Sequence, residues 1–390
     1  MGPNDQPDRP HDLVVDATAM PAQRAGAGVY SYNLVRALVA ALPADVHLTV
    51  LDRWGAFADL AGTPGLTLRH LEAPTRARRM LWEQTALPIQ LQQAGATIYH
   101  SLHHSLPLVS GGVALVSTVH DVTFRLLPWR YTYARRVYMH LSTLIAARRA
   151  RRIIVPSHSV ARDLARLYRV RPARIRVIAE AASPMMRVID DPAALEDLRQ
   201  RYRLPRSFIL SVGTLEPGKN RETLFRALAI LIGRGIACDL VVTGQAGWGN
   251  GQGDALAVRL GIERRVHYTG YVADADLPLL YNLADVFVYP SWREGFGLPP
   301  LEAMACGTAV VSSDQPAMPD VLGDAALYAA PGNAGALADQ VQALLLDLDR
   351  RASLVARGRQ RAARYSWQAA ARATLEVYRE LLPSVGERDR

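Results

Sequence analysis

Residues 208–243 read FILSVGTLEPGKNRETLFRALAILIGRGIACDLVVT and contain a complete strand-helix-strand pattern. The short apolar run Phe208–Val212 predicts a buried strand, Arg221–Arg234 has apolar residues at helical spacing, and Asp239–Thr243 predicts a second strand. Strands that alternate with helices of this length form βαβ units, whose strands lie parallel. The stretch therefore predicts a parallel sheet with helices on both faces.

The same alternation extends along the chain in both directions. Further strands are predicted at Asp12–Val15, His47–Leu51, Ala96–His100, Val113–Val119, Arg152–Pro156, Arg174–Ile178, Val266–Thr269, Val286–Tyr289 and Ala309–Ser312. Further helices are predicted at Tyr30–Leu42, Tyr131–Arg149, Ser159–Leu167, Ala193–Tyr202, Asp254–Leu260, Ala275–Leu283, Pro299–Ala305 and Met318–Leu322. We expect an α/β protein with two doubly wound parallel sheets.

The 390 residues exceed one ordinary domain of roughly 100–200 residues, so we expect two domains facing a central cleft. A stretch rich in Pro and Asp, Ser183–Pro192, predicts the boundary, which gives domains at 11–185 and 186–365. The final helix, at 366–385, is expected to reach back over the first domain.

Composition excludes several classes of protein. With 49% hydrophobic and 21% charged residues, the chain is globular, not disordered or fibrous. No apolar run approaches the roughly 18 residues of a membrane span, and the polar start is unlike a signal peptide, so we expect a cytoplasmic location. The only cysteines, Cys238 and Cys306, are too few for a disulfide framework or a Cys-ligated zinc site.

Positive charge is concentrated in the first half of the chain. Residues 1–190 contain 23 arginines and 13 acidic residues, whereas residues 191–390 contain 22 basic and 23 acidic residues. Arginines also flank the predicted helix Tyr131–Arg149 at both ends. This pattern indicates attraction to phosphates, including a peripheral contact with an anionic membrane, although a solvated arginine-rich surface is the open alternative. Nucleic acid is disfavoured, because the aromatic residues do not interleave with the basic clusters as stacking platforms would, and no nucleic-acid-binding fingerprint is present.

Lys219 is the only lysine in the chain, against 44 arginines. A compact ammonium differs from a guanidinium where one point charge enters a tight pocket, so Lys219 is a candidate for chemistry. The lysine lies just before the helix at 221–234, where loop N–H groups and the helix dipole also favour an anion. This arrangement is suited to a diphosphate.

Ligands of parallel α/β sheets bind where strands end and helices begin. Gly26 and Gly28 lie in such a loop and allow close approach of a phosphate or sugar, although a simple tight turn is the alternative. His120 follows a predicted strand, where a neutral imidazole can bind a sugar hydroxyl. His103 and His104 have no Cys or acidic residue at metal-ligand spacing, so no metal site is expected there.

The most informative loop is residues 290–307, PSWREGFGLPPLEAMACG. A predicted strand ends here, a glycine-containing loop contains Glu294, and Glu302 lies eight residues later, near the first turn of a predicted helix. Two carboxylates and a run of loop N–H groups are thus expected to face one pocket. Asp274 and Asp276 form an Asp-x-Asp triplet at a predicted helix start, where acids commonly cap, so we predict no metal.

These motifs resemble the retaining nucleotide-sugar glycosyltransferases of GT-B fold known as glycosyltransferase family 4, or group 1. The resemblance covers nearly the whole chain, from the Gly26/Gly28 loop through Trp82-Glu83-Gln84, His120-Asp121 and Pro156-Ser157 to the block that begins at Glu294. The spacing of Glu294 and Glu302 is its most specific part. The family implies that the C-terminal domain holds the donor and the N-terminal domain the acceptor.

The resemblance also implies roles by position. Lys219 neutralises the donor diphosphate, Glu294 holds donor-sugar hydroxyls, Glu302 the ribose hydroxyls, and His120 a sugar hydroxyl at the reacting face. The backbone of Phe296, Gly297 and Leu298 surrounds sugar and phosphate, and Gly28 approaches the diphosphate. Many relatives have arginine at the positions of Thr214 and Gly218. Neutralisation of the phosphate charge therefore depends mainly on Lys219, and Thr214 offers only a hydroxyl.

The expected activity is retaining, metal-independent transfer of a hexose, with no cofactor, to a glycan or a polyprenyl-diphosphate-linked acceptor. Similarity to bacterial mannosyltransferases suggests GDP-mannose as the donor. Two alternatives stay open: a GT-B sugar-nucleotide epimerase and a non-catalytic nucleotide-binding scaffold.

Overall fold

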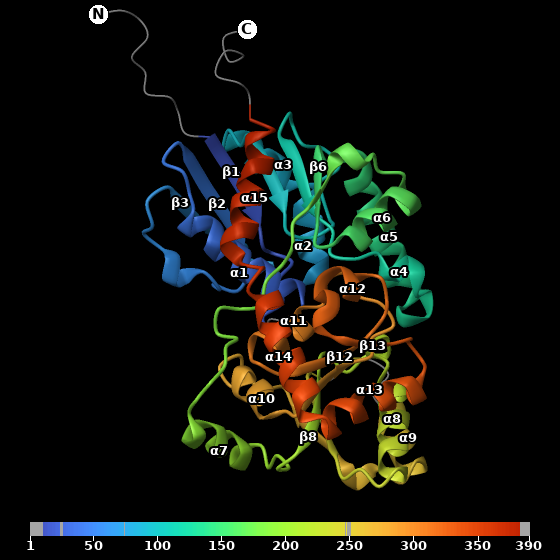
Figure 1. Ribbon diagram of the computed structural model, residues 1–390. Helices are drawn as coiled ribbons and strands as arrows, with labels where there is room; N and C mark the ends of the chain where they lie inside the picture. The colour runs from blue at the N-terminus through green and yellow to red at the C-terminus, as the bar shows by residue number, and fades with distance from the viewer. Residues whose placement is uncertain (1–10, 24–25, 74, 246, 248–250, 383–390) are drawn as a thin grey trace, which may run out of the picture. The chain divides into compact units, whose positions relative to one another are not determined.

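The computed structural model describes residues 11–23, 26–73, 75–245, 247 and 251–382, and the chain divides into two compact units (Figure 1). Unit 1 comprises Met1–Glu180 and Trp367–Arg390, and unit 2 comprises Ala181–Ser366. The sequence predicted the division after residue 185, a few residues beyond the division after Glu180 that the structure shows. No helix among the described residues is long and apolar enough to cross a membrane.

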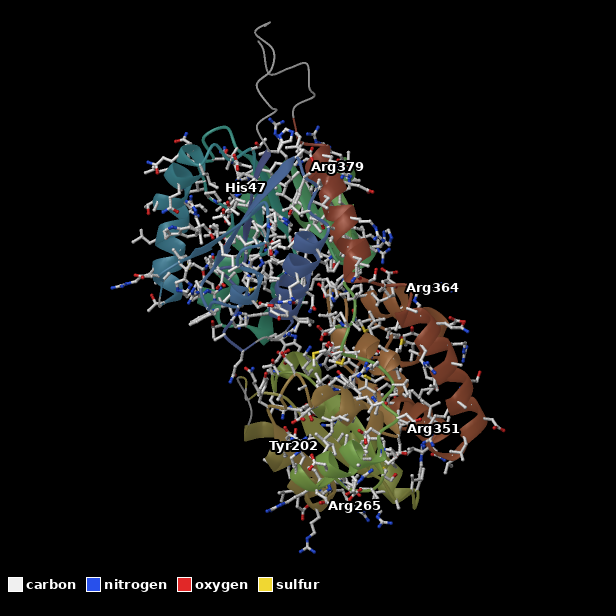
Figure 2. All side chains as sticks on the ribbon, turned by 90° about the vertical axis from the view of Figure 1, so that its left-hand side faces the viewer. His47, Tyr202, Arg265, Arg351, Arg364 and Arg379 are labelled. Atoms are coloured by element: carbon white, nitrogen blue, oxygen red, sulfur yellow. The ribbon has the colours of Figure 1, made fainter. Side chains whose placement is uncertain are left out.

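Unit 1 is built on a seven-stranded parallel sheet with the order β3-β2-β1-β4-β5-β6-β7. Its strands are β1 (His11–Asp16), β2 (Val46–Asp52), β3 (Leu66–His70), β4 (Ile98–Ser101), β5 (Ala114–Thr118), β6 (Arg152–Val155) and β7 (Ile175–Val177). At its outer edge, His47 (labelled in Figure 2) hydrogen-bonds Asp12 of β1 at 2.9 Å and Thr67 of β3 at 3.0 Å, which joins three neighbouring strands.

Helices cover the unit 1 sheet. They are α1 (Ala27–Ala40), α2 (Arg76–Gln84), α3 (Ala86–Gln93), α4 (Thr123–Leu126), α5 (Tyr133–Arg149), α6 (His158–Tyr168) and α15 (Trp367–Arg379), with short 3₁₀ turns at Ala58–Leu60, Pro128–Arg130 and Pro172–Arg174. Buried side chains of α3, α5 and α6 pack with those of the central strands in one apolar cluster. Figure 1 shows α15, at the end of the chain, lying along α1, against which it packs.

Unit 2 is built on a six-stranded parallel sheet with the order β10-β9-β8-β11-β12-β13. Its strands are β8 (Phe208–Val212), β9 (Asp239–Thr243), β10 (Val266–Gly270), β11 (Val286–Tyr289), β12 (Ala309–Ser313) and β13 (Leu327–Ala329). Its helices are α7 (Pro192–Arg201), α8 (Arg221–Gly233), α9 (Gly251–Arg259), α10 (Leu277–Leu283), α11 (Leu298–Ala305), α12 (Ala317–Leu322), α13 (Ala334–Leu346) and α14 (Leu348–Ala362), with 3₁₀ turns at Pro217–Lys219, Glu263–Arg265 and Gly323–Ala325.

Sequence features explain why the elements of unit 2 begin and pack as they do. The Asp191 carboxylate accepts hydrogen bonds from the first backbone N–H groups of α7, and Pro192 supplies a fixed φ at its first position. One face of the sheet buries alternate residues such as Ile209 and Val242 against the apolar sides of α8 and α13. β8 and β9, which contain these two residues, are rich in apolar and β-branched residues, as strands covered on both faces require.

In each sheet the earliest strand lies in the interior, and the chain leaves it in opposite directions on its two sides. β1 lies between β2 and β4, and β8 lies between β9 and β11. Ligands of such sheets bind at the carboxyl ends of the strands where this reversal occurs. The loops after β1 and β4 in unit 1, and after β8 and β11 in unit 2, are therefore the places to look for a site.

Candidate active site

The loop between β8 and α8 is held in a defined shape by its own polar groups. The Glu216 carboxylate, 2% exposed, accepts a hydrogen bond of 2.9 Å from Gly218 N. Asn220 adopts a left-handed backbone conformation with φ of 53°, and its side chain donates to the Pro290 carbonyl at 2.9 Å. Trp292 N donates to the Gly218 carbonyl at 3.0 Å. The loop after β8 is thus tied to the loop after the neighbouring strand β11.

Lys219 and Glu294 meet across these two loops. Lys219 Nζ donates to Glu294 Oε1 at 2.7 Å and to the Tyr289 hydroxyl at 2.7 Å. Both charged side chains are mostly buried, with 19% and 15% of their surface exposed. The lysine stem lies over Gly213, where a Cβ would be 3.2 Å from Lys219 Cε. A side chain at 213 would therefore press on the lysine.

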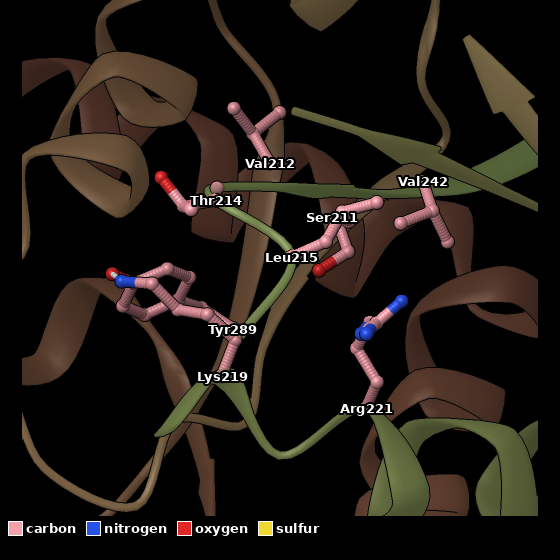
Figure 3. Close-up of a pocket in the computed structure, with 9 residues that line it drawn as sticks. Ser211, Val212, Thr214, Leu215, Lys219, Arg221, Val242 and Tyr289 are labelled. Carbon is pink, nitrogen blue, oxygen red and sulfur yellow. Dashed lines mark hydrogen bonds between the residues drawn. The ribbon is translucent and has the colours of Figure 1, made fainter. Parts of the chain in front are cut away.

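A small pocket lies beside this ion pair (Figure 3). Its lining includes Thr214, Lys219 and Tyr289, together with Ser211, Val212, Gly213, Leu215, Arg221 and Val242. In the view of Figure 3 the loop that contains Leu215 passes between Lys219 and Arg221. The pocket therefore adds two side chains that sequence reasoning missed, Tyr289 and Arg221. Tyr289 could have been found, because it is the last residue of a predicted strand.

The loop after β11 leads directly into α11. Gly297, the residue before α11, has a positive φ of 103°, and a Cβ there would lie 2.4 Å from Met318 Cε. Phe296 is 4% exposed, and its ring meets that of Tyr365 edge-on at 5.8 Å. Leu298, the first residue of α11, is 7% exposed. Phe296 and Leu298 therefore anchor the loop through their buried side chains, and a ligand would contact their backbone atoms.

Glu302 lies deeper in α11 than the sequence suggested. Because α11 begins at Leu298, Glu302 is in its second turn, and the first turn has no acidic residue. The carboxylate is 6% exposed and accepts a hydrogen bond of 3.0 Å from the Tyr281 hydroxyl. Burial, followed by the charge of Glu302, raises the pKa of Tyr281 well above its usual value, so the phenol stays a donor.

In unit 1, His120 follows β5 and has partners at both ring nitrogens. Nδ1 faces Glu180 Oε1 at 3.3 Å, Nε2 faces the Leu102 carbonyl at 3.1 Å, and the Tyr30 ring packs edge-on at 4.7 Å. Burial lowers the pKa of His120, but the hydrogen bond and charge of Glu180 outweigh it and the net pKa is raised. The two acceptors thus favour the protonated ring more than the strand-end position alone suggested, and the role of His120 at a sugar hydroxyl stays a prediction. Glu180, its partner, was not identified from the sequence.

The glycine loop of unit 1 precedes α1. Gly26 has a positive φ of 51° and stands at the N-terminal end of α1, with open space where a Cβ would be. Gly28 is the second residue of the helix, where a Cβ would lie 3.1 Å from Pro21 Cδ. The preceding residues 24 and 25 lie outside the described residues. Gly26, Gly28 and His120 thus belong to unit 1, and the other candidates to unit 2.

The acids considered as metal ligands have other partners. Asp276 precedes α10 but does not cap it, because its two carboxylate oxygens each accept a 2.9 Å hydrogen bond from Arg201 of α7. Hydrogen bonds from Arg201 are also the main reason that the pKa of Asp276 is lowered. Among the described residues, no three His, Cys, Asp or Glu side chains gather as metal ligands would. Cys238 and Cys306 are both free and buried.

Comparisons with known proteins agree with this arrangement. The family model described as "Glycosyl transferases group 1" matches residues 196–361, and that described as "Glycosyltransferase Family 4" matches residues 24–181. The chain is 34% identical to the O-antigen chain mannosyltransferase B of Escherichia coli over 286 residues, which are 73% of this chain and 74% of that protein.

Two solved structures have the same fold. The sucrose-phosphate synthase of Thermosynechococcus elongatus has a TM-score of 0.76 at 22% identity, over 95% of this chain and 99% of that one. Anabaena HepE in complex with UDP and glucose has a TM-score of 0.73 at 20% identity, over 95% and 100% of the two chains. Two parallel-sheet units of seven and six strands confirm the predicted GT-B architecture. The chain therefore belongs to the group 1, family 4 glycosyltransferases of GT-B fold, and it is a glycosyltransferase.

Proposed function

We propose that the donor of this glycosyltransferase is a nucleotide diphosphate hexose whose diphosphate is bound by Lys219. The observation on which this rests is the meeting of Lys219, Tyr289 and Glu294 at the carboxyl ends of β8 and β11. A cation, a buried hydroxyl and loop N–H groups at this edge suit a diphosphate. The UDP and glucose bound by a protein of the same fold support this class of donor.

Mannose from GDP-mannose is the proposed hexose donor. The support is the 34% identity to an O-antigen chain mannosyltransferase. In the proposed pose Glu294 holds donor-sugar hydroxyls, Glu302 the ribose hydroxyls, and Thr214 offers a hydroxyl. The backbone of Phe296, Gly297 and Leu298 contributes N–H groups around sugar and phosphate.

Catalysis in this proposal is mainly electrostatic. Cleavage of the anomeric C–O bond places negative charge on the departing diphosphate, which Lys219 and oriented N–H groups stabilise. The acceptor attacks from the same face with retention of configuration, and a phosphate oxygen of the leaving group accepts its proton. No metal ion is required in this scheme, because Lys219 supplies the positive charge.

The ion pair gives Glu294 a second role. In the described arrangement Glu294 neutralises Lys219 at 2.7 Å, so a diphosphate must compete with this carboxylate for the ammonium. Donor binding would release Glu294 toward the sugar hydroxyls as the phosphates take over the lysine. The same exchange would couple filling of the phosphate site to orientation of the sugar.

A thermal-shift panel tests the donor site. GDP, UDP, ADP and dTDP are added with and without Mg²⁺ to the wild type and to Lys219→Ala. We expect one nucleotide to raise the melting temperature strongly, independently of Mg²⁺, and the shift to be lost in the variant. Absence of a shift with every nucleotide, or an equal shift in Lys219→Ala, would contradict the proposal.

The acceptor is proposed to be a glycan or a polyprenyl-diphosphate-linked glycan, met at the cytoplasmic face of the membrane. On α5, Tyr133, Val137 and Leu141 recur every four residues and are 78%, 38% and 50% exposed. Arginines stand at both ends of the helix, at 135, 136, 148 and 149. An apolar stripe with flanking cations suits an anionic lipid surface.

Vesicle flotation tests the membrane contact. We expect binding to vesicles that contain phosphatidylglycerol and loss of binding when Arg135, Arg136, Arg148 and Arg149 are changed to Ser. The matched control changes Arg259, Arg264, Arg265 and Arg350 of unit 2 to Ser, which removes the same charge elsewhere. Equal binding by both quadruple variants would contradict the contact through α5.

A further inference from the structure

A cavity lies at the amino edge of the unit 1 sheet. Its volume is about 340 Å³, and its lining consists of Ser110, Gly112, Val113, Ala114, Leu115, Arg148, Arg149 and Arg151. β5 begins at Ala114, whereas the loops that contain Gly26 and His120 follow the carboxyl ends of β1 and β5. Because β1, β4 and β5 are parallel, the cavity and these loops lie at opposite edges of the sheet.

Two short segments bring three arginines to this cavity. Arg148 and Arg149 are the last two residues of α5, and Arg151 stands directly before β6. Arg151 N donates to the Leu115 carbonyl at 2.7 Å, which fixes the second segment against β5. All three arginines are exposed, so a ligand can reach their guanidinium groups from solvent.

A tight turn before β5 supplies further lining residues. Val113 N donates to the Ser110 carbonyl at 3.1 Å, and the two residues between them have positive φ values, 59° at Gly111 and 93° at Gly112. These angles define a type I′ turn, which favours glycine at both central positions. A Cβ at Gly112 would meet open space. The turn contributes the Ser110 hydroxyl, and none of the residues that line the cavity is acidic.

The positive charge of the three arginines has no balancing carboxylate. In the described parts of the chain, none of the three forms an ion pair. Arg152 and Arg176, on the neighbouring strands β6 and β7, both pair with Glu380 at 2.8 Å. The one carboxylate thus serves the neighbouring arginines, and the cavity keeps an excess of positive charge.

The helix dipole does not account for this cluster. It favours cations in the last turn of α5, but Arg151 lies outside the helix. The Ala150 carbonyl, at the end of the helix, already accepts a hydrogen bond from Arg174 Nη2. The pKa of Arg174 is lowered, by burial first and then by the charges of Arg171 and Arg152, so cationic groups already repel one another here. An anion in the cavity would reduce this repulsion.

The chemistry of the lining fits a phosphate group. A guanidinium presents its N–H donors in a planar fork that matches phosphate oxygens, and three guanidinium groups exceed the charge of about −2 on a phosphate monoester. The volume lies near the lower end of the range for small-ligand pockets, roughly 300–1,000 Å³, so the phosphate can carry a small organic part. No aromatic residue lines the cavity, so a nucleotide base would have no ring on which to stack.

We propose that this arginine cavity is a second anion site, which binds the phosphate group of a small phosphate monoester. The three arginines bind the phosphate oxygens, and the Ser110 hydroxyl donates to one of them. Soluble sugar phosphates and lipids such as phosphatidic acid both carry this group. Leu108 and Val109, directly before Ser110, are 55% and 63% exposed and would contact the apolar part of a lipid. The proposal does not rest on the proposed donor.

Isothermal titration calorimetry of the full chain tests the site without requiring turnover. The titrations use Lys219→Ala as the background, because this change removes the cation proposed for the donor diphosphate. Phosphate binding in this background then reports on the arginine cavity. Mannose 6-phosphate and inorganic phosphate are the phosphate probes, and methyl α-mannoside is the uncharged control.

The test variant changes the three arginines of the cavity to Gln in this background. The matched control removes the same charge from exposed arginines of unit 2, at 259, 264 and 350. We expect the control to bind both phosphate probes as the background does, and the test variant to bind them at least about tenfold more weakly, because charge-assisted hydrogen bonds are lost. All six side chains are exposed, so the melting temperature should change in neither variant.

Vesicle flotation identifies the source of the phosphate. Phosphatidylcholine vesicles with phosphatidic acid, whose headgroup is a phosphate monoester, are compared with vesicles of phosphatidylcholine alone. If the ligand is a lipid, flotation on phosphatidic acid should be lost in the test variant and weakened by Leu108→Ser with Val109→Ser. If the ligand is soluble, mannose 6-phosphate should bind while the test variant and the control float equally. Either pattern supports the site.

Three results would overturn the proposal. They are absence of binding by both phosphate probes and by the phosphatidic acid vesicles, equal affinity of the test variant and the control for every phosphate ligand, and binding of methyl α-mannoside as tight as that of mannose 6-phosphate. Failure of the proposed donor site would leave these titrations unchanged, because they are made without Lys219, so the two outcomes are distinguishable.

Discussion

Lys219 Nζ lies 2.7 Å from Glu294 Oε1, although the two residues are 75 positions apart in the chain. The contact depends on the sheet order: β8 and β11 are adjacent and parallel, so the loops that follow them lie at the same edge of the sheet. The only lysine of the chain is thus held by a carboxylate and a tyrosine in a mostly buried place. A stable position for this charge is what leaving-group stabilisation requires.

Lys219→Ala should remove roughly 2–4 kcal/mol of transition-state stabilisation, the scale of one preorganised charge contact, and should lower kcat/KM accordingly. Lys219→Arg should recover little of the lost kcat/KM, because a planar guanidinium does not fit over Gly213 as the lysine stem does. Steady-state transfer kinetics measure both effects. Arg226→Ala, at an exposed arginine of α8, is the control, and a Lys219→Ala enzyme with the wild-type kcat/KM would disprove the role.

Glu294→Gln should fold normally and lose turnover. The amide keeps the size of the side chain but removes the charge that balances Lys219, so nucleotide diphosphates should bind at least as tightly while kcat falls. Nucleotide thermal shifts and transfer rates on the same preparation separate the two effects. If kcat stayed at the wild-type value, Glu294 would not act on the donor sugar.

Gly297→Ala should lower the free energy of unfolding by about 2–4 kcal/mol, because it adds backbone strain to a clash with Met318. Gly261→Ala is the matched control, since its φ of 66° is also positive but a Cβ there meets open space. Urea unfolding of both variants isolates the packing cost. Equal losses in the two variants would show that Met318 moves aside without cost.

Glu180→Gln should change how stability depends on pH. The raised pKa of His120 means that the pair stabilises the folded state fully below the unfolded-state pKa of about 6.5, and that this contribution is lost as pH rises through the folded-state pKa. The stability difference between wild type and variant should therefore be large near pH 6 and small near pH 9. Urea unfolding at both values measures it.

Glu222→Gln, at an exposed carboxylate of α8 that pairs with Arg226, is the control for the pH experiment and should show no such trend. The NMR titration of His120 should also move to lower pH in Glu180→Gln, because the charge that favours the imidazolium is removed. An unmoved titration would mean that Leu102 alone sets the protonation of the ring.

The central strands and the edge strands β7 and β10 were predictable, whereas the edge strands β3 and β13 were not. Runs such as Phe208–Val212 and Val286–Tyr289 are apolar because both faces of the strand are covered. β3 (Leu66–His70) has no buried residue and contains Arg and His, and β13 (Leu327–Ala329) has three residues, so neither has the apolar pattern of a buried strand. The helices α2, α3 and α13 were also not predicted.

The site was predictable where its residues follow strands, and less so where distant residues complete it. Lys219 and Glu294 lie in loops whose position follows from the βα order, so their neighbourhood could be anticipated. Glu180 lies 60 positions from His120, and Tyr281 lies 21 positions from Glu302. Nothing in local spacing indicates such pairs, because they depend on how separate elements pack.

The position of α15 has a consequence for biosynthesis. Unit 1 needs this helix: Trp367 and Tyr378 are 3% and 1% exposed, and the Tyr378 hydroxyl lies 2.6 Å from the buried His100 ring. A nascent chain contains every strand of unit 1 long before it contains α15, because unit 2 is translated in between. We therefore expect unit 2 to finish folding first. A premature stop near residue 366 should destabilise unit 1, although unit 1 is translated first.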